Sequence, residues 1–171
     1  FLIALALVLL WMLFYYGNAG IYSNIALLLN ILLIFGILSG LGAVLTLPGI
    51  AGIVLTIGIA VDANVLIYER IREELYKGKG QKESVKDGFS NALSSILDAN
   101  ITTGLTALIL YVFGSGPIKG FATTLLIGIL TSLFTAIFIS RLLIDWHLNR
   151  GGKLGFSTGM TKGLFRSINI E

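Results

Sequence analysis

The stretch GIAGIVLTIGIAVDANVLIYERIREE, residues 49–74, decides the fold class of this chain. Residues 49–61 carry no charged side chain, and after Asp62 the sequence stays uncharged until Glu69. The hydrocarbon core of a bilayer is about 30 Å thick, and about 20 helical residues cross it. Residues 49–68 therefore predict a transmembrane helix that contains one carboxylate.

Apolar runs of similar kind lie on both sides of this stretch. They cover residues 1–16, 22–47, 96–113 and 121–144. The first run is short, and we expect it to be part of a helix from a longer chain. Together the five runs predict an all-α, polytopic membrane helix bundle of about five transmembrane helices within residues 1–144.

The composition excludes a water-soluble domain. Hydrophobic residues make up 56% of the 171 and charged residues 12%, whereas soluble domains carry about 25% charged residues. Cysteine is absent, and the single histidine, His147, has no second metal-ligand type at suitable spacing, so we expect neither a metal site nor a cofactor. The net charge of +3 comes mainly from the connections, which favours contact with the lipid surface and not with nucleic acid.

Positive charge in the connections predicts the orientation of the bundle. The connection 69–95 and the basic tail or linker 145–171 are both rich in lysine and arginine, whereas the connection 114–120 has only Lys119. The positive-inside rule then places the first two in the cytoplasm and the third outside. It follows that the N-terminus of this chain lies outside and its C-terminus in the cytoplasm.

Two weaker patterns concern packing. Val85, Phe89, Leu93 and Ile96 recur at helical spacing within the connection 69–95, which predicts either an amphipathic helix on the membrane surface or a connector helix packed on the core. Glycines at small-residue spacing predict close helix packing within the spans; they are Gly36, Gly40, Gly52, Gly58 and Gly128.

Asp62 is the candidate functional residue. It precedes Glu69, the first charge of the following connection, by seven residues, which is about 10 Å along a helix. An ionised carboxylate there costs about 2.5–3.5 kcal/mol on insertion scales, and an apolar environment favours its neutral form. Asp62 is therefore a candidate proton carrier. The alternative is a permanently neutral side chain that hydrogen-bonds a neighbouring helix.

Polar residues near Asp62 form a candidate relay. The tripeptide Asp-Ala-Asn occurs at 62–64 and again at 98–100, and antiparallel spans would bring both copies to the cytoplasmic side. Asn64, Asp98, Asn100, Thr102 and Thr106 are thus candidate relay residues, although a helix-start role for Asp98 is the stronger interpretation. The predicted spans contain no Lys or Arg, so a partner charge for Asp62 must come from another subunit or from further sequence.

The residues TLPGIAGIVLTIGIAVDANVLIYERIREE, 46–74, closely resemble the fourth-span signature of bacterial SecD proteins. The segment 98–137, which contains GPIKG at 116–120, resembles their fifth and sixth spans. The family's essential intramembrane aspartate falls on Asp62. The tail GFSTGMTKGLFRSINIE at 155–171 faintly resembles the join of fused SecDF chains.

The resemblance implies a member of the RND superfamily in the bacterial cytoplasmic membrane. With SecF, such a protein uses the proton motive force to help pull unfolded secreted polypeptides across the membrane. Its expected partners are SecF, the SecYEG channel, indirectly SecA, and the lipid bilayer, and no enzymatic reaction is expected. The alternatives are an RND-type exporter of small molecules or lipids and a passive scaffold of the Sec channel.

Overall fold

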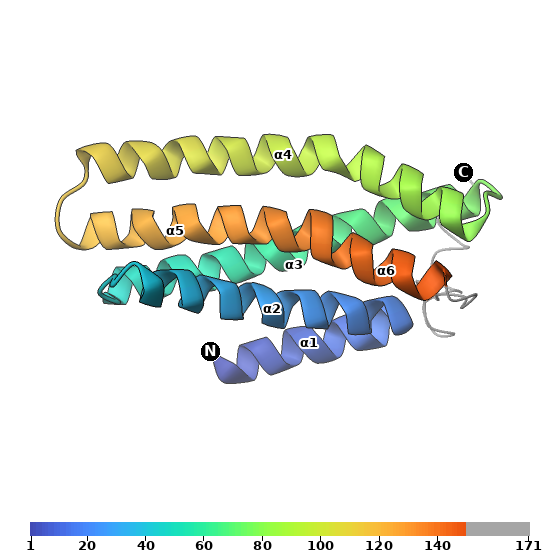
Figure 1. Ribbon diagram of the computed structural model, residues 1–171, viewed down its shortest axis with the longest axis horizontal. Coiled ribbons are helices and arrows are strands. Elements are labelled where there is room, and N and C mark those ends of the chain that lie inside the picture. Colours follow the sequence, from blue (N-terminus) through green and yellow to red (C-terminus); the bar gives the residue numbers. More distant parts are fainter. Residues whose placement is uncertain (150–171) are drawn as a thin grey trace.

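The computed structural model describes residues 1–149, and within them it is helical and contains no strand. Figure 1 shows long helices that run side by side. In chain order the elements are α1 (Leu2–Tyr16), α2 (Asn18–Gly40), α3 (Leu47–Tyr76), α4 (Gln81–Phe113), α5 (Pro117–Phe134), the π-helical segment η1 (Thr135–Ile139) and α6 (Ser140–Asn149).

Four helical units are long and apolar enough to cross a membrane. They are α2, α3, α4 and the continuous unit Pro117–Asn149, which joins α5, η1 and α6; α1 is apolar but shorter, with 15 residues. These elements confirm the all-α membrane helix bundle. The predicted tail 145–171 begins inside α6, and its residues 150–171 lie outside the described part of the chain.

The connection expected at 69–95 is almost entirely helical. Helix α3 continues to Tyr76, α4 begins at Gln81, and the turn between them covers only 77–80. Of the amphipathic set, Val85, Phe89 and Ile96 are buried in the core cluster that α3 shares. The segment is therefore a connector packed on the core, because α3 extends far enough to cover its apolar face.

Ion pairs hold the tip of this α3–α4 hairpin together. The carboxylate of Glu74, 3% exposed, lies 3.1 Å from Lys77 Nζ and 2.6 Å from Lys79 Nζ, and Asn91 donates to it at 3.1 Å. Lys79 also pairs with Asp87 at 2.7 Å. Hydrogen bonds to Asp87 and Glu74 raise the pKa of Lys79, so the lysine stays charged and the two helices are tied together.

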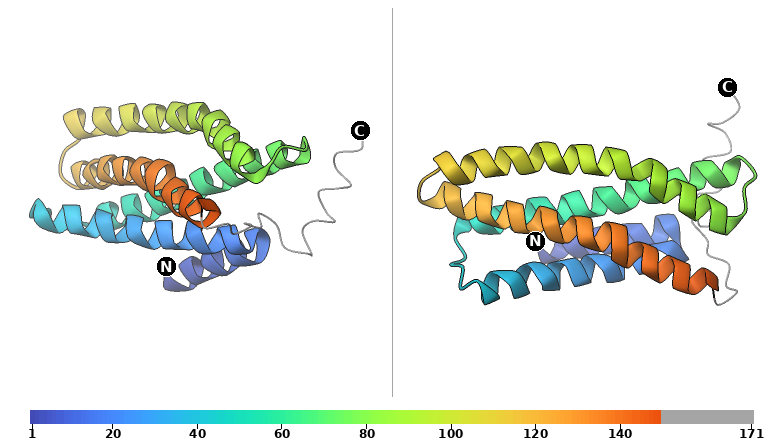
Figure 2. Two further views of the ribbon diagram at one scale, coloured as in Figure 1. Left: turned by 45° about the vertical axis from the view of Figure 1, so that its right-hand side comes forward. Right: turned by 45° about the horizontal axis from the view of Figure 1, so that its top comes forward.

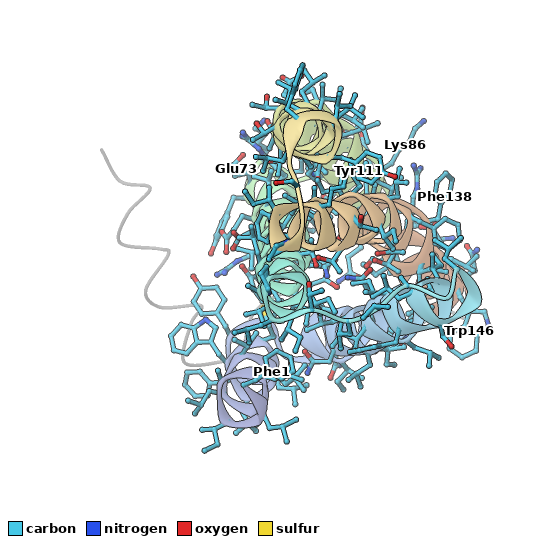
Figure 3. The ribbon with its side chains drawn as sticks, turned by 90° about the vertical axis from the view of Figure 1, so that its left-hand side faces the viewer. Phe1, Glu73, Lys86, Tyr111, Phe138 and Trp146 are labelled. Atoms are coloured by element: carbon cyan, nitrogen blue, oxygen red, sulfur yellow. The ribbon has the colours of Figure 1, made fainter. Side chains whose placement is uncertain are left out.

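Helix α3 lies between the other helices of the bundle, as the two views of Figure 2 show. Its side chains contribute to the core cluster shared with α1, α4 and α6 and to a second cluster shared with α2. Large apolar side chains such as Phe138 and Trp146 point outward (Figure 3), with 62% and 50% of their surface exposed. Such a surface suits contact with lipid.

Close packing through glycine occurs at two of the five expected positions. A Cβ at Gly128 would collide with the side chain of Thr56, and one at Gly52 with Thr124, so glycine lets α3 and α5 approach closely. At Gly36, Gly40 and Gly58 an added Cβ would meet nothing within 4 Å. The prediction was wrong for these three within the described chain, because no neighbouring helix approaches them closely.

This difference gives a paired test of packing. We expect Gly128→Ala to destabilise the bundle, by about 1–3 kcal/mol, because the buried Thr56 side chain blocks the added methyl group. The matched control is Gly36→Ala, where space is open, and alanine there should leave stability unchanged or raise it slightly. The midpoint of thermal unfolding in detergent compares the two; equal midpoints would contradict the close α3–α5 contact.

Candidate functional site

Asp62 lies at the middle of α3, which runs from Leu47 to Tyr76. Its side chain is exposed in this chain. It borders two pockets, one of about 180 Å³ between α3 and α4 and one of about 300 Å³ between α1 and α3. The carboxylate therefore sits on an open face of the bundle at mid-helix depth.

The pocket between α3 and α4 brings the two Asp-Ala-Asn tripeptides together. Asp62 and Ala63 from the first copy and Ala99 and Asn100 from the second line it. Asn100 is 5% exposed; its Nδ2 donates to the carbonyl of Ile96 at 2.7 Å, and its Oδ1 has no partner among the described residues. The pocket thus holds one buried acceptor that is free to accept a hydrogen bond.

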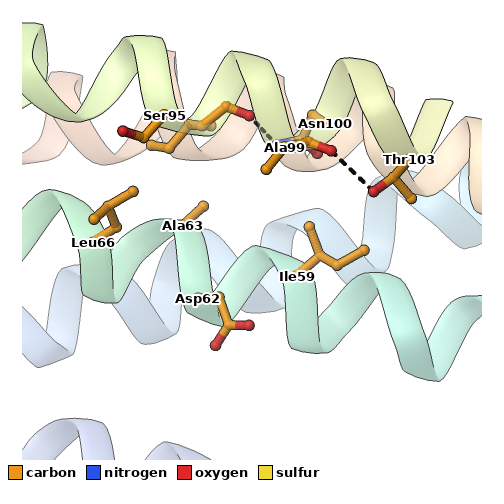
Figure 4. A pocket seen from close by; sticks show the side chains of 9 residues that line it. Ile59, Asp62, Ala63, Leu66, Ser95, Ala99, Asn100 and Thr103 are labelled. Carbon is orange, nitrogen blue, oxygen red and sulfur yellow. Dashed lines mark hydrogen bonds between the residues drawn. The ribbon is translucent and has the colours of Figure 1, made fainter. Parts of the chain in front are cut away.

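The carboxylate of Asp62 points away from α4 (Figure 4). On its other side lies the pocket shared with α1, where Asp62 is the only ionisable side chain among apolar lining residues of 1–149, such as Leu5, Val8 and Val61. Within the described chain Asp62 makes no hydrogen bond or ion pair.

Asn64 belongs to the opposite side of α3. It is 3% exposed, and its Oδ1 accepts a hydrogen bond of 3.0 Å from the hydroxyl of Ser140, which is fully buried at the start of α6. Two residues along a helix correspond to a rotation of about 200°. Asp62 on the open face and Asn64 in the core therefore point to opposite sides of α3 and move together when this helix moves.

The remaining relay candidates lie elsewhere. Asp98, Thr102 and Thr106 are exposed on α4 and do not line either pocket at Asp62. The hydroxyl of Thr102 donates to the carbonyl of Asp98 at 2.9 Å, and that of Thr106 to the carbonyl of Thr102 at 3.1 Å. Both hydroxyl groups therefore donate their protons to backbone carbonyls of α4 itself.

Basic side chains are absent from the two pockets at Asp62, since no Lys, Arg or His of residues 1–149 lines them. The first buried basic side chain after Asp62 on α3 is Arg72, ten residues or about 15 Å further along the helix. Arg72 lies 3.4 Å from Glu69, which also accepts a 2.8 Å hydrogen bond from Tyr16.

The sequence reasoning missed Ser140 and the π-helical segment before it. For Ser140 a signal was present, because Thr131, Ser132, Thr135 and Ser140 place hydroxyl groups in the otherwise apolar stretch 131–140. All four are buried. Among residues 1–149, no group of acidic, histidine or cysteine side chains could hold a metal ion.

Comparison with known proteins relates this geometry to one family. Residues 1–150 match the family model described as protein export membrane protein SecD/SecF, C-terminal. The chain is 59% identical over 143 residues to the protein translocase subunit SecD of Desulfurispirillum indicum, covering 84% of this chain and 28% of that protein. For SecD of Koribacter versatilis the identity is 51% over 149 residues, or 87% and 28% of the two chains.

Solved structures agree with the sequence matches. The crystal structure of SecDF from Thermus thermophilus, described as a translocon-associated membrane protein, superposes with a TM-score of 0.86 at 44% identity, covering 90% of this chain and 22% of that one. SecDF in a super-membrane-facing form gives 0.84 at the same identity and coverage. The chain thus spans little more than a quarter of the length of these curated relatives. It belongs to the SecD/SecF family of protein export membrane proteins, and it corresponds to their C-terminal membrane portion.

Proposed function

We propose that this chain is the proton-coupled membrane portion of a Sec protein-export subunit, and that Asp62 carries the protons. One observation supports this most: Asp62 lies at the middle of α3, borders two pockets, and is exposed and without a hydrogen bond or ion pair among residues 1–149. A group that is expensive to place in a membrane and is not used for packing is a candidate for proton transfer. No covalent step is involved.

The open face around Asp62 is the basis for proposing a partner. Lipid would be a poor environment for an ionised carboxylate, so another protein surface is expected to cover this face and supply a polar or basic group. We assign that surface to SecF, as a separate subunit or a fused half. Through the complex we propose contact with the SecYEG channel, indirectly with SecA, and with the unfolded polypeptide in transit.

The coupling follows from the energy of a charge in the membrane potential. One proton that crosses 100 mV releases about 2.3 kcal/mol. Protonation removes the charge of Asp62 and weakens its attraction to the covering surface, whereas deprotonation restores it. The two states then favour different packing of α3 against the partner. Asn100 is the relay candidate that borders the same pocket.

The carrier role predicts a selective loss of proton-driven export. In vesicles with full-length protein and SecF, we expect Asp62→Asn to abolish the part of preprotein release that depends on the proton motive force, because an amide cannot bind and release the proton. The matched control is Asp98→Asn, on exposed α4 surface away from both pockets, which should retain release. Unchanged release by Asp62→Asn, with normal assembly, would favour a passive scaffold.

A transport assay also separates protein export from an RND-type exporter of small molecules or lipids. The export proposal requires that the Asp62→Asn defect appears with a secreted polypeptide as cargo. A defect confined to efflux of a dye or lipid, with polypeptide release intact, would favour the exporter.

The orientation that we propose, in the bacterial cytoplasmic membrane, has a direct test. A cysteine at Ser115, in the turn between α4 and α5, should react with a membrane-impermeant maleimide in intact spheroplasts. A cysteine at Lys82, at the α3–α4 hairpin, should react only after permeabilisation, because the basic connection lies in the cytoplasm. The reverse labelling pattern would contradict the proposed orientation.

A further inference from the structure

The long helix that ends the described chain changes its geometry once. Residues Thr135–Ile139 form a π-helical turn between α5 and α6. Such turns are rare, and within α-helices they frequently occur at functional sites. Just before and within this turn, the hydroxyl of Thr131 donates to the carbonyl of Gly128 at 3.0 Å, and that of Thr135 to the carbonyls of Thr131 and Ser132 at 3.0 and 3.2 Å. Bonds of this kind often bend helices.

The two halves of this helix contact α3 in different ways. The outer half, α5, is fixed by close approach, since Gly52 faces Thr124 and Gly128 faces Thr56. Neither pair leaves room for sliding. The inner half, α6, shares a core cluster with α3 through Ile144 and Leu148, and its first residue, Ser140, donates the buried hydrogen bond to Asn64.

The position of that bond links it to Asp62. Asn64 is two residues from Asp62 and on the other side of α3, while Ser140 is the first residue after the π-helical turn. A shift or rotation of α3 that follows a change at Asp62 must move Asn64 by a similar amount. The bonded Ser140 then either moves with it, by bending at the π-helical turn, or loses a bond that water cannot replace in this buried position.

We propose that Asn64 and Ser140 are a positioning pair that transmits the protonation state of Asp62 to a bend at Thr135–Ile139. This inference rests on the proposed proton-carrier function and deepens it. The pair touches no transported proton. Its role is to make α6 follow α3 while α5 stays fixed.

The test measures the bend directly in the full-length protein with SecF, in lipid nanodiscs. Spin labels at Ile118→Cys on α5 and Leu142→Cys on α6, which are 48% and 65% exposed in this chain, report the distance across the π-helical turn. We expect Asp62→Asn, which imitates the neutral aspartate, to shift the distance distribution. In a Ser140→Ala background that shift should disappear.

Ser132→Ala is the matched control. Ser132 is also a buried serine of this helix and also contacts an asparagine, since Asn30 Nδ2 donates to it at 3.4 Å, but it precedes the π-helical turn. The shift should persist in this background. Its loss in both backgrounds would indicate general loosening of the bundle and overturn the specific role of Ser140, as would its persistence in both.

A double-mutant cycle provides a second readout. If Asn64 and Ser140 act only through each other, Asn64→Ala, Ser140→Ala and the double variant should reduce proton-driven preprotein release by the same factor. If the double variant instead loses release by the product of the two single-variant factors, the two residues act independently, and the proposed pair is rejected.

The same samples separate this inference from the proposed function. If Asp62→Asn abolishes proton-driven release but leaves the label distance unchanged, Asp62 remains the carrier and the bend is rejected. If release is unaffected while the distance shifts in a Ser140-dependent way, the mechanical link holds and the carrier role is rejected.

Discussion

The lack of water in the hydrocarbon core is the constraint on which this structure depends. Backbone polar groups must be satisfied within each helix, and polar side chains must find partners inside the protein. Most of them do so: threonines along α4 and α5 donate to carbonyls of their own helix, and Asn30 and Asn64 each share a hydrogen bond with a serine. Asp62 does not, because its carboxylate lies on an open face and makes no such contact among the described residues. Two other groups near it share this lack of a partner: the exposed carboxylate of Asp98 and the buried Oδ1 of Asn100.

The interface between α3 and the last long helix combines two kinds of contact. Along α5, glycines allow backbone approach so close that an added methyl group would collide with a threonine. Along α6, Ile144 and Leu148 belong to the core cluster that α3 shares, and Ser140 donates a hydrogen bond to Asn64. Dispersion forces hold both regions over many atoms, and the hydrogen bond adds one directional contact at the start of α6. Motion in such an interface is expected to concentrate on the α6 side, where no glycine brings the two backbones together.

The sequence predicted the helical membrane class, the approximate spans and the place of Asp62 inside one of them, because hydrophobic run length and isolated charge are local properties. It did not distinguish glycines in close helix contacts from glycines with open space beside them. Gly36 and Gly128 both lie in apolar runs, but only Gly128 has another helix packed against it. The same holds for the two Asp-Ala-Asn copies, of which Asn100 borders the pocket of Asp62 while Asp98 does not. Ser140 was missed because its partner is 76 residues away along the chain, and the π-helical turn has no simple sequence signal.

The α3–α4 hairpin has a further mechanical consequence. Helices α3 and α4, of 30 and 33 residues, exceed the about 20 residues that cross a bilayer, so their joined ends project beyond it. The ion pairs of Glu74, Lys79 and Asp87 make this projection stiff. Gly78, at its tip, follows Asp62 by 16 residues, about 24 Å along a helix. A tilt of about 10° at the level of Asp62 would move the tip by about 4 Å. The hairpin would thus act as a lever arm. A small tilt of α3 at the level of Asp62 would become a displacement of about 4 Å at the hairpin tip, outside the bilayer.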